Sequence, residues 1–129
     1  MHHFRFLAAA AMTMAIAAPA TAQPARPFSM AALKAAQAKR QPILIDVYAP
    51  WCPTCRAQAP TIDALSKSPA YDKLVILRLD FDNQVAEKKA LGVRQQSTLI
   101  LYKGSREVGR TLGITDPGQI KAFAAKALG

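Results

Sequence analysis

The sequence predicts an α/β fold in which a four-stranded mixed sheet is flanked by helices on both faces. Two observations lead to this fold class. Apolar, β-prone runs alternate with amphipathic segments, as in proteins that cover a sheet on both sides. The last two β-prone runs are separated only by a tight turn, which predicts an antiparallel hairpin. The 129 residues suffice for one domain with one modest core.

The expected order of elements is α-β-α-β-α-β-β-α. The expected helices cover residues 30–40, 52–65, 85–91 and 117–128. The expected strands cover residues 43–49, 73–82, 98–104 and 106–113. Ser29 and Asp116 are candidate N-caps of the first and last helices, and Pro117 suits the first helical position. Pro60 interrupts the second helix, and Gly92 ends the third.

Residues 1–22 have the pattern of a secretory signal peptide. Arg5 supplies a positive start, an apolar run follows, and Ala20, Thr21 and Ala22 form a small-residue site for cleavage after Ala22. The apolar run is shorter than the roughly 20 residues of a spanning helix, although an uncut anchor is the alternative. We therefore expect export to a bacterial periplasm, where disulfides persist. Residues 23–27 would be a short tether to a domain over residues 28–129.

The composition is basic, with 17 Lys and Arg against 8 Asp and Glu. Cleavage would remove Arg5 and both histidines and leave a net charge of +8. This charge fits an acidic partner or an anionic membrane surface, but a solvated basic surface is the favoured interpretation. Aromatic and basic residues do not interleave, and export argues against nucleic acid as a partner.

The only two cysteines, Cys52 and Cys55, are three positions apart and allow three interpretations. Structural zinc commonly needs four ligands, and the exported chain would have no histidine, so a metal site would need a second copy of the chain. A structural disulfide across so short a loop would stabilise the fold little. A redox pair fits best, because Cys52 would begin a helix, where backbone N–H groups and the helix dipole favour a thiolate. Pro53 is tolerated at the first helical position, and Cys55 would lie one turn inward as the resolving thiol.

The segment ILIDVYAPWCPTCRAQAP, residues 43–60, resembles the active-site segment of the thioredoxin family. Trp51 matches the family's tryptophan before the first cysteine, and Pro60 matches the proline of its active-site helix. The resemblance covers about residues 28–129. It implies a thioredoxin-like fold without the extra N-terminal strand of full thioredoxins, and thiol–disulfide exchange by Cys52 and Cys55 with no cofactor beyond the dithiol. Asp46 matches the buried Asp that assists proton transfer to the resolving cysteine.

The resemblance also assigns the neighbours of the cysteine pair. Arg78 falls where the family has a Lys near the buried Asp, and it keeps the positive charge. Pro53 and Thr54 separate the cysteines in place of the Gly-Pro of cytosolic thioredoxins, and the two intervening residues tune the redox potential. No metal ligands are expected.

One position departs from the family pattern. The family has a cis-proline in the loop facing the cysteines, and this chain has Ser97 there. A non-proline cis bond costs ~3–4 kcal/mol, so we expect a trans Gln96–Ser97 bond. The N–H and hydroxyl of Ser97 would then be available near Cys52. Gln96, Ser97 and Thr98 are the expected substrate-binding residues, and Ser97→Pro is expected to change substrate rates with little change in fold.

The sequence thus predicts a monomeric, periplasmic thiol–disulfide oxidoreductase that reduces protein disulfides. Reduction is favoured over oxidation because Asp46 and Arg78 resemble residues of the reducing members. The resemblance implies a membrane thiol-electron transporter as the reductant. The alternatives are a disulfide oxidase and a non-enzymatic module that binds a metal or a client protein.

Overall fold

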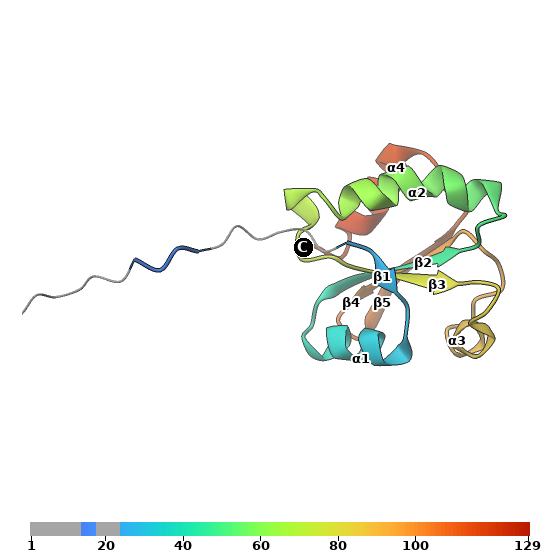
Figure 1. Ribbon diagram of the computed structural model, residues 1–129, viewed down its shortest axis with the longest axis horizontal. Coiled ribbons are helices and arrows are strands. Elements are labelled where there is room, and N and C mark those ends of the chain that lie inside the picture. The colour runs from blue at the N-terminus through green and yellow to red at the C-terminus, as the bar shows by residue number, and fades with distance from the viewer. Residues whose placement is uncertain (1–13, 18–23) are drawn as a thin grey trace, which may run out of the picture.

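The structure is a computed structural model that describes residues 14–17 and 24–129. A twisted sheet lies between two layers of helices (Figure 1). The strands are β1 (Arg26–Pro27), β2 (Pro42–Tyr48), β3 (Val75–Asp80), β4 (Thr98–Lys103) and β5 (Arg106–Leu112). The helices are α1 (Met30–Ala38), α2 (Pro53–Leu65), α3 (Val85–Ala90) and α4 (Pro117–Ala125), with a short 3₁₀ turn at Pro69–Tyr71. The α/β fold class and the order of the predicted elements are confirmed.

The strand order across the sheet is β1-β3-β2-β4-β5. β2 runs parallel to β3 and antiparallel to β4, so the sheet is mixed, as the sequence predicts. β2 occupies the centre because its residues Ile43–Val47 are apolar on both sides apart from Asp46, and all are buried. Its carboxyl end therefore leads directly from the middle of the sheet to the two cysteines.

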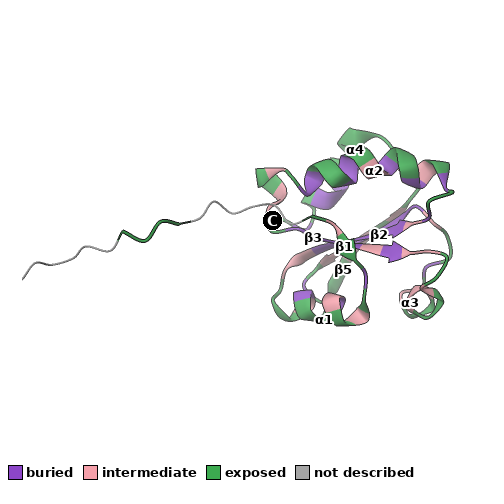
Figure 2. Cartoon of the chain, viewed as in Figure 1, coloured by how far each residue is buried: buried purple, intermediate pink, exposed green. Residues whose placement is uncertain are grey.

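Two apolar cores lie on opposite faces of the sheet (Figure 2). One core packs under α1 and includes Leu33, Ile43, Ile45, Val47, Leu77 and Ile100. The other packs under α2 and α4 and includes Leu44, Ile62, Ile76, Leu99, Ile120 and Phe123. Successive residues of β2 thus alternate between the cores, as the two-residue period of a strand requires.

Local signals in the sequence set where the elements begin and turn. The Ser29 hydroxyl accepts the Ala32 N–H at 3.0 Å, and the Asp116 carboxylate accepts the Gln119 N–H at 2.9 Å. Both residues are the N-caps that the sequence predicts. The hairpin between β4 and β5 turns at Gly104, whose φ of +61° is readily adopted only by glycine.

The sheet has five strands and not the predicted four, because β1 adds a two-residue edge strand parallel to β3. The sequence prediction placed these residues, Arg26 and Pro27, in the tether. A strand of two residues is too short to show an alternation of apolar and polar residues, so sequence periodicity could not predict it. It is held by the next residue, Phe28, which is buried and donates its N–H to the Arg78 carbonyl at 2.8 Å.

The predicted signal peptide and its cleavage site after Ala22 lie almost wholly outside the described residues. Within residues 14–17 and 24–129, no helix has the length and apolar character needed to cross a bilayer.

Candidate active site

The cysteine pair lies where the central strand β2 gives way to helix α2. Cys52 is the N-cap of α2 and Pro53 is its first residue, as the sequence predicts. The Cys52 Sγ accepts the backbone N–H of Cys55 at 3.1 Å. The sulfur thus occupies the place that a Ser or Asp oxygen has in an ordinary N-cap. A negative charge on this sulfur would be stabilised by the free N–H groups of the first turn.

The two thiols are both reduced and both buried, with exposed fractions of 2% for Cys52 and 1% for Cys55. Cys55 lies one turn inward of Cys52, as predicted, but burial hardly separates the two thiols. Hydrogen bonding distinguishes the two thiols, because the Cys55 thiol donates to the Val47 carbonyl at 3.7 Å. Burial, followed by its hydrogen bond with Cys52, raises the pKa of Cys55 to about 11.

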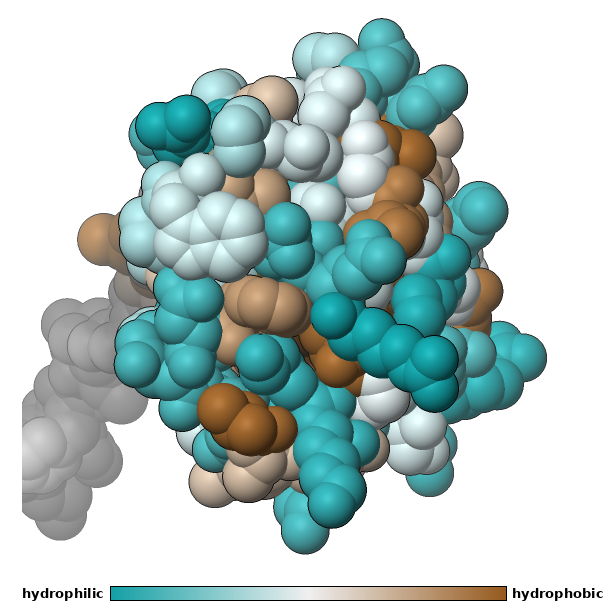
Figure 3. All heavy atoms as spheres, turned by 90° about the vertical axis from the view of Figure 1, so that its right-hand side faces the viewer, coloured by the Kyte–Doolittle hydropathy of each residue, from teal (hydrophilic) through white to brown (hydrophobic). Residues whose placement is uncertain are grey.

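Trp51 provides exposed apolar surface next to the cysteines. Its side chain is 55% exposed, its indole N–H donates to both Asp82 carboxylate oxygens at 3.1 and 2.9 Å, and its ring meets the Phe81 ring edge-on. Pro53 is also exposed and Thr54 is half-buried. Figure 3 faces this end of the molecule, where apolar side chains lie in patches between hydrophilic ones. Trp51 is thus exposed and not part of the core.

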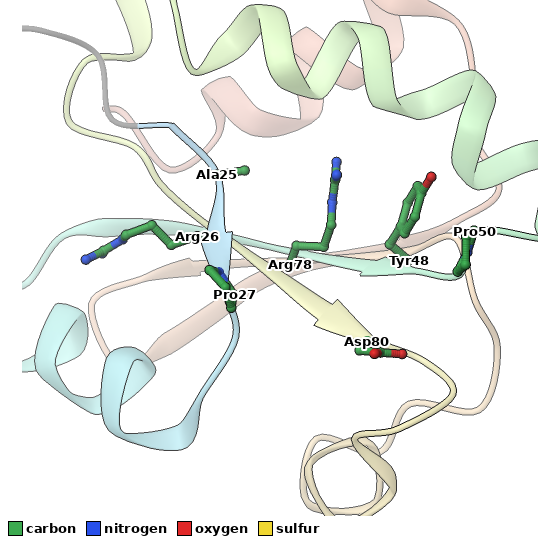
Figure 4. A pocket seen from close by; sticks show the side chains of 7 residues that line it. All are labelled: Ala25, Arg26, Pro27, Tyr48, Pro50, Arg78 and Asp80. Carbon is green, nitrogen blue, oxygen red and sulfur yellow. The ribbon is translucent and has the colours of Figure 1, made fainter.

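Asp46 and Arg78 form an ion pair on the face of the sheet that α2 covers. Arg78 Nε donates to Asp46 Oδ2 at 2.8 Å, and Asp46 is only 1% exposed. Arg78 also lies 3.6 Å from the carboxylate of Asp63 in α2, and its guanidinium stacks over the Tyr48 ring. Figure 4 shows Arg78 and Tyr48 pointing to the same side of the sheet. The predicted proximity of Asp46 and Arg78 is therefore found.

Burial dominates the titration of Asp46. Desolvation raises the pKa of this carboxyl group above its ordinary value, and the charge and hydrogen bond of Arg78 oppose this only in part. Its second oxygen, Oδ1, has no hydrogen-bond partner among the described residues. The thiol of Cys55 donates to the carbonyl of Val47, the residue that follows Asp46 in β2.

A pocket of about 360 Å³ opens beside this ion pair, where β1 meets β3 (Figure 4). It is lined by Ala25, Arg26, Pro27, Tyr48, Pro50, Arg78 and Asp80. Neither cysteine lines it, so the pocket gives no direct access to the dithiol.

Hydrogen bonds within the protein fix the loop that faces the cysteines. Among the described residues no peptide bond is cis, so the Gln96–Ser97 bond is trans, as predicted. Ser97 has a φ of +59°, which turns its N–H inward onto the Val47 carbonyl at 2.9 Å. Its hydroxyl donates to the Gln96 carbonyl at 2.6 Å.

The expectation that the N–H and hydroxyl of Ser97 are available near Cys52 is therefore wrong, because both donate within the protein. Thr98 is buried and its hydroxyl donates to the Gln95 carbonyl at 2.7 Å, whereas Gln96 is half-buried. The structure brings all three residues beside the dithiol end of β2, but substrate contact by them stays a prediction.

A further buried polar residue, not predicted from the sequence, is Gln58, which lies one turn after Cys55 in α2. It is fully buried, and its Nε2 donates to the Ile114 carbonyl at 2.8 Å and to the Ser97 carbonyl at 3.3 Å. A signal was present in the sequence, because Gln58 is a polar residue three positions from Cys55 on a face of α2 that also buries Ile62.

Metal binding receives no support from side-chain clusters in the described part of the chain. No group of three or more His, Cys, Asp and Glu residues there is arranged to hold an ion.

Comparison with known proteins places this geometry in a family. The family model for thioredoxin matches residues 27–126. Thioredoxin from Alicyclobacillus acidocaldarius is 33% identical over 68% of this chain and 83% of its own length, and thioredoxin from Haemophilus influenzae is 35% identical over 64% and 76%. The crystal structure of Trxlp from Edwardsiella tarda superposes with a TM-score of 0.74 at 43% identity, covering 76% of this chain and 95% of its own. With its thioredoxin-like fold and its Cys-x-x-Cys dithiol, the chain belongs to the thioredoxin family and is a thiol–disulfide oxidoreductase.

Proposed function

We propose that this protein reduces protein disulfides in the periplasm, with Cys52 as the attacking thiol and Cys55 as the resolving thiol. The observation that carries the proposal is the contact between the Cys55 N–H and Cys52 Sγ at the start of α2, beside the exposed Trp51. The contact places a backbone N–H donor at the start of a helix against the sulfur that would attack the substrate. Trp51 offers a surface on which an apolar part of a substrate can pack.

The reaction proceeds by two exchanges at sulfur. The Cys52 thiolate attacks one sulfur of a substrate disulfide, a Cys52–substrate disulfide forms, and the other substrate sulfur leaves as a thiolate. Cys55 then loses its proton and attacks Cys52 Sγ. The Cys52–Cys55 disulfide forms and the second substrate thiolate leaves. The substrate gains two electrons and the protein dithiol loses two.

Asp46 is the proposed acceptor of the Cys55 proton, directly or through a water molecule. Its raised pKa makes the carboxyl group a better base than an ordinary Asp, and Oδ1 is free to take the proton while Oδ2 is held by Arg78. Arg78 orients the carboxyl group through this single contact and is a positioning residue.

The direction and the location rest on the sequence. The leader-like residues 1–22 support export, and the Asp46–Arg78 pair is of the kind that the reducing members have. A reductase in an oxidising compartment needs a supply of electrons, and a membrane thiol-electron transporter would reduce the Cys52–Cys55 disulfide after each cycle. We propose a monomer as the working state.

A redox titration of the dithiol tests the proposal, with Cys52→Ala as the control. A reductase is expected to show a potential of about −250 mV or lower, together with turnover of a model protein disulfide. A potential of about −120 mV would show a disulfide oxidase instead. Purification with stoichiometric metal and no turnover would contradict the enzymatic function.

A further inference from the structure

Ser97 is held in a backbone conformation that few residues other than glycine adopt. Its φ of +59° is unfavourable for a side chain with a Cβ atom, and such a residue persists only where its surroundings fix it. The surroundings here are hydrogen bonds. The Ser97 N–H donates to the Val47 carbonyl, and the Ser97 carbonyl accepts both the Gly113 N–H at 3.0 Å and Gln58 Nε2.

The Gln58 side chain links this loop to helix α2 by hydrogen bonds. Both neighbours of its amide group are carbonyl oxygens, of Ser97 and Ile114, so the nitrogen and not the oxygen must face them. Its Oε1 has no partner within the described residues, although the side chain is fully buried. A buried acceptor without a partner destabilises the fold, and an apolar residue would avoid this. The two hydrogen bonds that its amide group donates are therefore the contacts through which this glutamine can act.

The loop and the Cys55 thiol share one hydrogen-bond acceptor, the carbonyl oxygen of Val47 in β2. This oxygen accepts the Ser97 N–H at 2.9 Å and the Cys55 thiol at 3.7 Å. When Cys55 loses its proton, the carbonyl dipole would repel the thiolate. The Ser97 N–H still occupies the oxygen at that moment and offsets part of the repulsion.

We propose that Gln58 is a positioning residue for the resolving step, because it holds the Ser97 N–H against the Val47 carbonyl beside Cys55. This inference rests on the proposed function, in which Cys55 displaces the substrate from Cys52. Without Gln58, the Ser97 loop relaxes from its left-handed conformation and its N–H leaves the Val47 carbonyl. The Cys55 thiolate then forms less readily and the mixed disulfide persists for longer.

The N–H groups near Cys55 support this assignment. Hydrogen bonding from the backbone of Ala49 and of Ser97 lowers the pKa of Cys55, against the larger effects of burial and of Cys52 that raise it. A proline at position 97 would lack the N–H altogether.

The two exchange steps can be followed separately with a chromogenic aromatic disulfide. The reduced protein releases one aromatic thiolate when Cys52 attacks and a second when Cys55 resolves. Gln58→Met is expected to slow the second release about tenfold at neutral pH and to move its pH profile upward by about one unit, with the first release unchanged. The matched control is Thr61→Val. It changes another buried side chain of α2, one that makes no hydrogen bond to the Ser97 loop among the described residues. It should match the wild type in both steps.

Equal slowing of both releases by Gln58→Met, or no change in either, would overturn the assignment and leave Gln58 a structural residue. A second measurement needs no variant. Amide hydrogen exchange on the wild type should show a protected Ser97 N–H in the reduced state, and exchange at the rate of an exposed loop amide would overturn the assignment. A wild type that never releases the second thiolate would contradict the proposed function itself, and the role of Gln58 with it.

Discussion

Arg78 Nε lies 2.8 Å from Asp46 Oδ2, whereas Asp46 Oδ1 has no partner among the described residues. A buried carboxyl group is thus oriented by one strong contact but only partly compensated for its loss of water. Its raised pKa follows from this imbalance, and it makes the stability of the fold depend on pH.

Asp46→Asn is expected to raise the free energy of unfolding at neutral pH. Because the folded protein holds the Asp46 proton more tightly than the unfolded chain, the wild type loses stability as the pH rises from about 4 through the raised pKa. The gain in the variant should be about 1.4 kcal/mol for each unit of the pKa shift. Urea unfolding of both proteins across this pH range measures it. Parallel stability curves would contradict a raised pKa.

Arg78→Met should destabilise the protein at neutral pH by about 1–3 kcal/mol, because the Asp46 carboxylate then lacks the one partner that it has among the described residues. In the Asp46→Asn variant, the side chain at position 46 has no charge for Arg78 to compensate. The same Arg78→Met change in that background should therefore cost less, and urea unfolding of the four proteins gives the coupling. Additive effects would show that the two side chains do not interact energetically.

Small alkylating reagents should distinguish the two thiols of the reduced protein. At pH about 8, a thiol with a pKa of about 11 is about 0.1% thiolate, so Cys55 should stay unmodified while Cys52 reacts. Peptide mass mapping after timed labelling measures this, and the urea-unfolded chain, in which both thiols should react, is the control. Labelling of both cysteines at similar rates in the folded protein would count against the assigned roles.

Ser97→Pro should lower stability by about 2–4 kcal/mol, contrary to the sequence expectation that it leaves the fold nearly unchanged. Proline fixes φ near −65°, far from the observed +59°, and it removes the N–H that bonds to the Val47 carbonyl. Ser97→Gly keeps that N–H and fits the conformation, so its stability should stay within about 1 kcal/mol of the wild type. Chemical denaturation compares them. A stable Ser97→Pro protein would mean that the loop can adopt another conformation without loss.

Gly109→Ala should destabilise the packing of β5 against α4. A Cβ atom at Gly109 would lie 2.9 Å from Phe123 Cε2, closer than contacting carbon atoms allow. Overpacking of this kind typically costs about 1–3 kcal/mol. Thermal unfolding measures the loss, and the added change Phe123→Leu should recover part of it if the ring is the cause.

The sequence predicted the elements whose signals are local. Ser29, Asp116 and Pro117 mark helix starts through capping chemistry, and the apolar run of β2 requires cover on both faces. The N-cap position of Cys52 follows from the same reasoning, since a strand ends just before it and Pro53 suits the first turn.

The remaining features depend on contacts between distant segments. β1 is too short to have a pattern and exists only through its pairing with β3. The inward N–H of Ser97 depends on a positive φ that a serine does not signal, and Gln58 gains its partners only when α2 packs over the loop. Such features follow from the packed structure, so sequence periodicity alone misses them.

The short strand β1 also bears on how the protein separates from its clients. During exchange, a partly unfolded client would be tethered to Cys52 near a sheet with two open edges, β1 and β5. Arg26 and Pro27 occupy one edge, and β5 carries Arg106, Glu107 and Arg110. Charged residues and proline disfavour the addition of a foreign strand. A tethered client would therefore gain little backbone pairing at either edge that could delay its departure.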